Sequence, residues 1–291
     1  MSLTAYLSHP DSGLSRFFED SFPNRDALLK RHGLESPLLR VAPPDGINAG
    51  TVGTAFDFLL RFDLTPTPSL DLALMGAKLA GPTYVALQAE LADRVGRRRQ
   101  QDALPRSCYL AALFTEVYRS GAIWPGSLLS QVTKRTTLDQ LLGLVPNAAV
   151  EDLEAMLGVA REVLVPVILA RGGPLAIGPV FDGSRWVSAD ADIISAGLLL
   201  DVKTTVGTKR KDGSRYDSLD RRTLYQLLGY LLFDFSDAYS IKEIGLYSAR
   251  FGRLTTWPVA DVLAELASSE ASLADLRRRC ELVVRSLADE P

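Results

Sequence analysis

The chain has 291 residues, enough for one large domain or two small ones. Its composition, with 47% hydrophobic and 23% charged residues, is ordinary for a soluble globular protein. A formal net charge of −3 excludes a polycationic protein held to nucleic acid by global attraction, so such a ligand needs a local basic patch. The first residues lack a secretory signal, and the apolar stretches are too short to cross a bilayer. We therefore expect a cytoplasmic protein without a membrane partner.

Cysteine and histidine are too scarce to form a metal site of their own. Cys108 and Cys280 lie far apart and show no CxxC spacing, which excludes a local zinc ribbon and favours buried or partly buried free thiols. The two histidines, His9 and His32, both fall in the N-terminal arm. A bound metal must therefore be held mainly by carboxylates, which selects hard ions such as Mg²⁺ or Mn²⁺.

The first half of the chain is predicted to be mainly helical. Residues 1–50 indicate short helices and loops, and a helix is expected to start near Thr51. From Ser69 to about Val167 the apolar residues recur with helical spacing, interrupted by proline and glycine, which predicts four to six helices. We expect residues 1–68 to form an arm with the first core helix. Residues 69–170 then form a helical subdomain, whose surface is a candidate for a protein partner.

Three acids, Glu151, Glu154 and Glu162, lie on the last predicted helix of this subdomain, where a solvated helix face is favoured over a metal site.

The spacing of apolar residues changes from helical to strand-like after the turn signal at Arg171–Pro174. The predicted strands are Ala176–Phe181, Trp186–Ile194, Leu198–Thr205, Lys242–Arg250 and Arg253–Pro258.

A polar loop, Val206–Asp220, and a helix, Arg221–Phe235, separate the third predicted strand from the fourth. Strands combined with helices in this order predict an α/β fold, with a central mixed sheet flanked by helices. We expect the core to span residues 171–258 and an amphipathic helical region to occupy residues 259–291.

The segment from Val187 to Thr205 carries the strongest chemical signal. A tight turn at Ala196-Gly197 sets an antiparallel register that pairs Ser195 with Leu198, Asp192 with Asp201 and Asp190 with Lys203. Because side chains alternate along a strand, Asp190 and Asp192 share one face, as do Asp201 and Lys203. A slip by one residue would leave this grouping within each strand unchanged.

Carboxylates in such a cluster repel one another unless a cation lies between them. The pattern therefore predicts a divalent metal that polarises a phosphate and lowers the pKa of a bound water, while Lys203 steadies the attacking hydroxide or the developing charge. Asp190 is then a neighbour of the ligands, or a ligand itself if the hairpin slips. The alternative interpretation is an exposed hairpin with a salt-bridged acid–lysine pair.

The next predicted helix adds a second motif. Gln226 and Tyr230 are spaced i, i+4, and Arg222 lies one turn earlier, so the three share a helix face. Taken alone, this spacing is also explained by a core tyrosine and a surface glutamine. An acid, then D-x-K nine residues later, then QxxxY on the next helix is a more specific order.

This arrangement resembles the PD-(D/E)XK nuclease superfamily and, within it, the RecB-type branch. The residues that carry the resemblance are Ala191–Ile194, Asp201–Thr205 and Gln226–Tyr230. The resemblance implies a restriction-endonuclease-like core and a Mg²⁺- or Mn²⁺-dependent hydrolase that cleaves DNA. It further implies metal binding by Asp192 and Asp201, a catalytic role for Lys203, and contacts to substrate or metal-bound water by Gln226 and Tyr230.

The sequence departs from that branch in several places. The branch carries a GxxxH helix upstream whose histidine is a metal ligand, and the matching segment here reads Gly53-Thr54-Ala55-Phe56-Asp57. Asp57 is then either a ligand or an i, i+4 salt-bridge partner of Arg61. Two cysteines cannot hold the four-cysteine iron–sulfur cluster of many relatives, and the chain has no GxxxxGK[ST] phosphate loop.

Two basic segments are candidates for nucleic-acid contact: Arg97–Arg99 and Lys209–Arg222. In the second, which leads from the D-x-K motif into the helix, we predict phosphate contacts from Lys209, Arg210, Lys211 and Arg222. The sequence does not separate DNA from RNA as the substrate. A role in phage or mobile-element defence follows only from how such nucleases are commonly used, and the alternative function is an inactive restriction-like fold that binds DNA or serves as a scaffold subunit.

Overall fold

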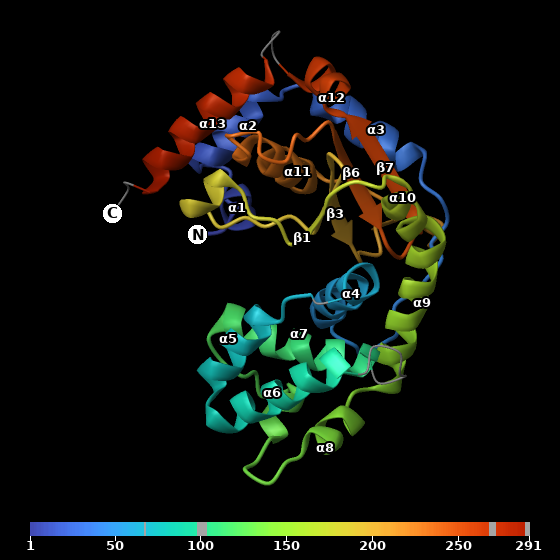
Figure 1. Cartoon of the computed structure of the whole chain (residues 1–291). Coiled ribbons are helices and arrows are strands. Elements are labelled where there is room, and N and C mark those ends of the chain that lie inside the picture. The colour runs from blue at the N-terminus through green and yellow to red at the C-terminus, as the bar shows by residue number, and fades with distance from the viewer. Residues whose placement is uncertain (67, 98–103, 268–271, 289–291) are drawn as a thin grey trace. The chain divides into compact units, whose positions relative to one another are not determined.

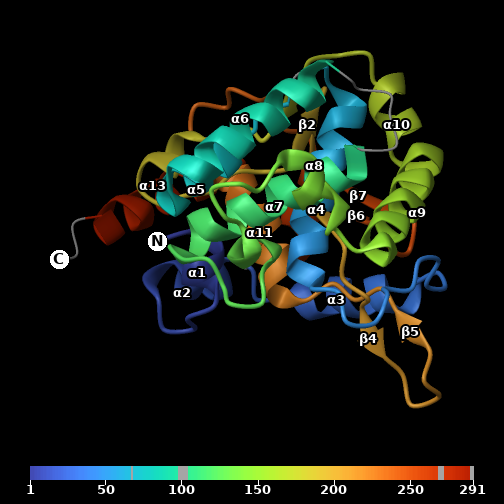
Figure 2. The same cartoon turned by 90° about the horizontal axis from the view of Figure 1, so that it is seen from below.

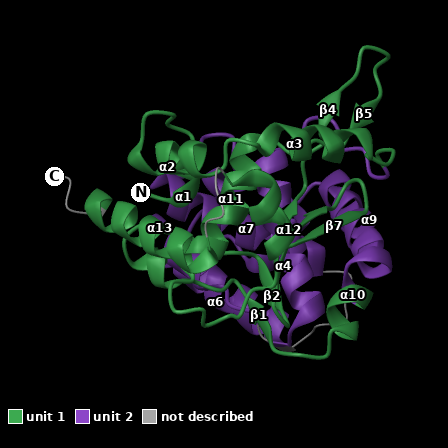
Figure 3. Ribbon diagram, turned by 90° about the horizontal axis from the view of Figure 1, so that it is seen from above, with its two compact units in different colours: residues 1–39, 166–291 green, residues 40–165 purple. Residues whose placement is uncertain are grey.

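The structure is a computed structural model, and it describes residues 1–66, 68–97, 104–267 and 272–288, without the side chains of residues 97 and 288. The chain forms two compact units, one of residues 1–39 and 166–291 and one of residues 40–165 (Figure 3). Within the described ranges, no helix is both long and apolar enough to span a membrane.

The unit of residues 40–165 is built from helices. They are α4 (Ala49–Leu64), α5 (Asp71–Ala80), α6 (Pro82–Arg97), α7 (Leu104–Ser120), α8 (Leu138–Gly143) and α9 (Asn147–Val163), with a short 3₁₀ helix at Leu128–Gln131. A further helix, α10 (Val165–Ala170), crosses the boundary between the units. With α10 included, the described residues between 69 and 170 form six helices, α5 to α10, which is the upper end of the expected four to six.

Helix α4 packs on α7 and α9, so it belongs to the helical unit. The sequence-based division placed it with residues 1–68, but α4 clusters with the helical unit, and its apolar residues Phe56 and Leu59 are buried. The unit therefore begins near residue 40 and not at residue 69. Close packing of α5 on α7 depends on Gly76, where a Cβ would overlap the carbonyl of Phe114.

The unit of residues 1–39 and 166–291 contains a mixed five-stranded sheet, in the order β1-β2-β3-β6-β7. The strands are β1 (Leu175–Ile177), β2 (Ile193–Ser195), β3 (Leu198–Lys203), β6 (Glu243–Ser248) and β7 (Arg253–Pro258). Strand β3 runs parallel to β6, and the other neighbouring strands are antiparallel. A mixed sheet flanked by helices confirms the α/β class.

The α-helices wholly within the described residues of this unit are α1 (Leu3–Leu7), α2 (Gly13–Ser21), α3 (Arg25–Leu34), α11 (Arg221–Phe233), α12 (Val259–Leu266) and α13 (Leu273–Ala288). Helix α11 packs directly on β3 and β6, and α1 and α13 pack on α11 (Figure 1). The buried core lies between α11 and the sheet and includes Leu199, Leu228 and Leu246. This packing fixes α11 against the strand that carries the D-x-K motif.

Two predicted strands are much shorter than expected. From Ala176–Phe181 only residues up to Ile177 are in β1, because Gly178 adopts a positive φ of 62° and a 3₁₀ helix follows at Asp182–Arg185. From Trp186–Ile194 only the last two residues are in β2. The alternating apolar residues Val187, Ala189 and Ala191 are buried in the core without forming a ladder. Their alternation therefore predicted burial correctly but predicted strand pairing wrongly.

The predicted loop Val206–Asp220 contains a small antiparallel ribbon, β4 (Thr208–Lys209) paired with β5 (Arg215–Tyr216). Gly213 closes its turn with a positive φ of 88°, a conformation that favours glycine. The ribbon projects from the rest of its unit (Figure 2). Its strands are two residues long and carry no apolar alternation, so no strand was predicted in this loop.

Candidate functional site

The β2–β3 hairpin has the predicted turn and the predicted pair Ser195–Leu198, but the expected pairs of Asp192 with Asp201 and of Asp190 with Lys203 are not part of its ladder, and Asp190 instead forms an isolated bridge with Val180. Ser195 pairs with Leu198, and both turn residues, Ala196 at 46° and Gly197 at 82°, have the positive φ that a two-residue hairpin turn requires. The ladder ends at the Ile193–Leu200 pair, just before Asp192 and Asp201. There Asp192 Oδ2 accepts a hydrogen bond from the backbone N–H of Val202 at 2.6 Å, so its carboxylate lies beside the D-x-K segment.

A chain of polar contacts joins the D-x-K motif to α11. Lys203 Nζ lies 2.7 Å from Asp201 Oδ2 and donates a hydrogen bond to Gln226 Oε1 at 3.1 Å. Gln226 Nε2 in turn donates to Tyr230 Oη at 2.5 Å. Together with Asp192, the structure therefore gathers all five residues of the predicted catalytic set.

Helix α11 is positioned for these contacts by its N-cap. The side chain of Asp220 accepts the backbone N–H of Thr223 at 2.7 Å, which satisfies one of the otherwise unpaired donors of the first turn. The helical repeat then places Arg222, Gln226 and Tyr230 along one face. Arg222 is exposed, and its Nη1 donates to Ser8 Oγ at 3.3 Å.

Burial shapes the electrostatics of the site. Asp201 is 2% exposed, and burial raises the pKa of its carboxyl although Lys203 beside it favours the ionised form. Burial disfavours the charged form of Lys203, but the negative charges of Asp201 and Asp192 outweigh this effect and raise its pKa. Burial, followed by the same two carboxylates, also raises the pKa of Tyr230, so its phenol keeps its proton at neutral pH.

Tyr230 is a core residue as well as a member of this set. It is 5% exposed, and its ring stacks on Phe181 with ring centroids 5.8 Å apart. Gln226 is partly exposed and lines a cavity, whereas Tyr230 does not. Gln226 is therefore the member of the pair placed to touch a ligand, and Tyr230 holds it in position.

The residues of the site that could hold a cation are two carboxylates, Asp192 and Asp201. Asp192 and Asp201 supply carboxylates, the ligand type that Mg²⁺ and Mn²⁺ prefer. In the part of the chain that the structure describes, no group of three or more histidine, cysteine, aspartate or glutamate side chains is placed to hold a metal. Two carboxylates with water and substrate oxygens match the usual protein environment of Mg²⁺.

A polar cavity of about 620 Å³ adjoins this set within the same unit. Lys203 and Gln226 line it, together with Ser8, Asp217, Arg222 and Ser248. Its wall includes α1, a part of the N-terminal arm that the sequence did not connect with the site. A ligand in this cavity would meet the ammonium of Lys203 and the amide of Gln226.

A buried polar network next to Lys203 was missed by the sequence analysis. His32 Nε2 lies 3.0 Å from Asp217 Oδ2, and Ser248 Oγ donates to Asp217 Oδ1 at 2.9 Å. Ser248 is paired with Lys203 across β3 and β6, so the network supports the end of the motif strand. His32 and Asp217 are 185 residues apart in the chain, and no local pattern signals their contact.

The other predicted metal candidates, Asp57 and Asp190, make contacts of their own. Asp57 is in α4 of the helical unit, where its Oδ1 accepts a hydrogen bond from Arg61 Nε at 2.8 Å, as the salt-bridge interpretation expected. Asp190 is exposed and lies outside β2, in an isolated bridge with Val180, although its charge contributes to the raised pKa of Tyr230.

The three glutamates of the helical unit, Glu151, Glu154 and Glu162, are all exposed on α9, as expected for a solvated face. Cys108 and Cys280 are both buried with free thiols. Burial raises the pKa of both thiols, which disfavours the reactive thiolate form.

The basic residues of the β4–β5 ribbon, Lys209, Arg210 and Lys211, are exposed and are called the basic tip below. The guanidinium of Arg210 stacks 4.8 Å from the ring centroid of Tyr216, which stiffens the ribbon. The acid in the turn, Asp212, accepts hydrogen bonds from the backbone N–H and the hydroxyl of Ser214. Of the second basic segment, Arg98 and Arg99 lie outside the described residues, as does the side chain of Arg97.

Comparison with family models, with curated proteins and with solved structures gives no match to this chain. The chemistry of the site is therefore argued from its own residues.

Proposed function

We propose that this protein is a metal-dependent phosphodiesterase of the PD-(D/E)XK type, with a restriction-endonuclease-like core, and that it hydrolyses DNA. One observation carries the proposal: an acid, the D-x-K pair and the QxxxY pair, spread over 39 residues from Asp192 to Tyr230, form a connected polar set beside a polar cavity.

Asp192 and Asp201 would hold Mg²⁺ or Mn²⁺, which supplies a Lewis acid for the phosphate and lowers the pKa of a bound water. Lys203 lies beside both the Asp201 carboxylate and the Gln226 amide, and its ammonium would steady the attacking hydroxide or the developing charge on a phosphate oxygen. Asp201 and Gln226 fix the direction of its ammonium. Tyr230 fixes the Gln226 amide in turn.

The nucleic-acid part of the proposal is supported by charge. The ribbon carries four basic residues, those of the basic tip and Arg215, against one acid, Asp212, in a chain whose net charge is −3. It follows β3 directly and leads into α11, so it is tethered at both ends to the elements that carry the motif. Arg222 adds a cation to the lining of the polar cavity.

A cleavage assay on the full chain tests the proposal. Linear and circular DNA, single- and double-stranded DNA, and RNA are each incubated with Mn²⁺ or with EDTA. We expect Mn²⁺-dependent cleavage by the wild type and its loss in Lys203→Ala. The exposed Lys242→Ala serves as the matched control and should retain the wild-type rate.

Two results would overturn the proposal. Cleavage by Lys203→Ala at the wild-type rate would reduce the lysine to a salt-bridge partner. DNA binding without cleavage of any substrate by the wild type would assign the protein to the inactive, DNA-binding alternative.

A further inference from the structure

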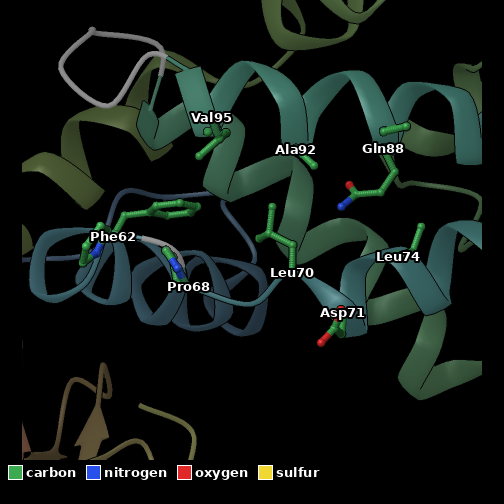
Figure 4. A pocket seen from close by; sticks show the side chains of 11 residues that line it. Phe62, Pro68, Leu70, Asp71, Leu74, Gln88, Ala92 and Val95 are labelled. Carbon is green, nitrogen blue, oxygen red and sulfur yellow. The ribbon is translucent and has the colours of Figure 1, made fainter. Parts of the chain in front are cut away.

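The helical unit contains a second cavity, of about 430 Å³. It lies among the C-terminal end of α4, the segment that follows it, α5 and α6, and its walls are mostly apolar (Figure 4). The apolar walls are formed by Phe62, Pro68, Leu70, Leu74, Ala92 and Val95. Its volume is in the range of small-molecule sites in proteins.

Among the described residues of this wall, one buried polar side chain has an atom without a hydrogen-bond partner. Gln88 is 1% exposed, and its Oε1 has no hydrogen-bond partner among the residues that the structure describes. Figure 4 shows the amide of Gln88 directed into the cavity beside Leu70 and Leu74. Buried carbonyl oxygens are nearly always hydrogen-bonded, because burial without a partner is unfavourable. The amide therefore points to a missing donor.

A single water is a poor candidate for that donor. An ordered buried water normally makes two to four hydrogen bonds, and the side chains around the Gln88 amide, Leu70, Leu74 and Ala92, offer none. Asp71 contributes the one acidic side chain of the lining and is exposed, while the described lining has no basic side chain. An anionic ligand is therefore disfavoured, and a neutral one fits the walls.

We propose that this cavity binds a small, neutral, mainly apolar molecule that donates one N–H or O–H hydrogen bond to Gln88 Oε1. The walls supply affinity by removing apolar surface from water, and the amide supplies selectivity for a donor. The site is independent of the proposed nuclease chemistry, because all of its lining residues belong to the helical unit.

Two matched pairs of probes test this proposal on the full chain: indole with 1-methylindole, and phenol with anisole. In each pair methylation removes the donor and keeps the apolar body. Dissociation constants are measured by ligand-observed NMR titration. We expect at least one donor probe to bind, about tenfold tighter than its methylated partner, which corresponds to one hydrogen bond to a buried acceptor.

Two variants assign the binding to this cavity. Gln88→Leu replaces the amide by an apolar side chain and should abolish the preference for the donor. Ala92→Phe fills the cavity and should abolish binding of both members of a pair. Ala86→Phe, on the same helix but outside the lining, is the control and should bind as the wild type does.

The proposal fails if none of the four probes binds the wild type, or if each pair binds equally. It also fails if Gln88→Leu keeps the preference, or if Ala92→Phe binds the probes as well as Ala86→Phe does. Should Gln88→Leu not fold, the comparison of the two phenylalanine variants still decides.

Discussion

Replacing Lys203 by methionine tests whether the carboxylate beside it is built to receive a cation. The change keeps most of the length of the side chain and removes its charge, which leaves Asp201 buried next to an apolar group. Without metal, the variant should be less stable than the wild type. With a divalent metal, a new cation is available to Asp201, so much of the lost stability should return.

The magnitude follows from the burial of the pair. Removing one partner of a fully buried ion pair costs about 3–5 kcal/mol. The Lys203 side chain is 27% exposed, and the raised pKa of Asp201 lets the carboxyl take up a proton, so we expect a smaller loss of about 1–3 kcal/mol. Metal at a hundred times its dissociation constant adds about 2.7 kcal/mol. Because the lysine no longer repels the metal, the variant should gain more than the wild type.

Urea unfolding in EDTA and in saturating Mn²⁺ measures the difference in free energy of unfolding between Lys203→Met and its parent, called the gap below. The assay is best done in a Trp124→Phe background, because the two remaining tryptophans, Trp186 and Trp257, both report on the unit that contains the site. The gap between Lys203→Met and its parent should narrow to under about 1 kcal/mol in Mn²⁺.

Arg277→Met is the matched control. It breaks another buried pair of the same unit, with Asp234 at 3.2 Å, for which no metal is proposed. Its loss of stability should be the same in Mn²⁺ and in EDTA. If Lys203→Met also shows the same gap in both conditions, metal and lysine do not share Asp201, and the assignment of this carboxylate is wrong.

Four further predictions address single contacts. Tyr230→Phe removes the hydrogen bond that holds the Gln226 amide and should lower the single-turnover cleavage rate about tenfold, the effect expected for one hydrogen bond. Tyr239→Phe removes a hydroxyl that donates to a surface carbonyl and should leave this rate unchanged, so equal losses in the two variants would indicate a general packing effect. Changing the three residues of the basic tip to alanine should lower the salt slope of DNA binding by about 2–3, at roughly 0.7–0.9 per lost phosphate contact, and an unchanged slope would make the ribbon a solvated turn. Asp57→Asn should leave Mn²⁺ affinity by calorimetry unchanged because Arg61 binds this carboxylate, and a tenfold loss would return it to the ligand set. Asp220→Ala should lower the free energy of unfolding by about 1 kcal/mol and Asp220→Asn by much less, since asparagine also caps helices; similar losses would argue against capping.

The short-range part of the site was predictable from the sequence. The period of two along a strand placed Asp201 and Lys203 on one face, and the glycine after Ala196 set the turn and register. The i, i+4 spacing placed Gln226 over Tyr230 in the same way. These inferences succeeded because local geometry alone decides them.

The long-range part was not predictable in this way. The contact of His32 with Asp217 and the position of α1 at the polar cavity depend on how distant segments pack. The segment Trp186–Ile194 has the alternation of a strand, yet its apolar side chains are buried largely without a partner strand. Alternation reports which side chains are buried, and the fold decides whether a ladder forms.

Helix α4 shows the same limit at the level of domains. Its apolar face can be predicted from the sequence, but the pattern of an amphipathic helix does not predict which element packs on that face. In the structure α7 and α9 pack on it, and the compact unit therefore starts near residue 40.

The proposed function depends most on a divalent cation held by Asp192 and Asp201. Calorimetric titration of Mn²⁺ into the wild type and into Asp201→Asn tests this directly, because asparagine keeps the shape of the side chain and removes its charge. We predict binding of one or two ions to the wild type and at least a tenfold loss of affinity in the variant. Equal affinity of the two proteins, or no binding to the wild type, would contradict the account.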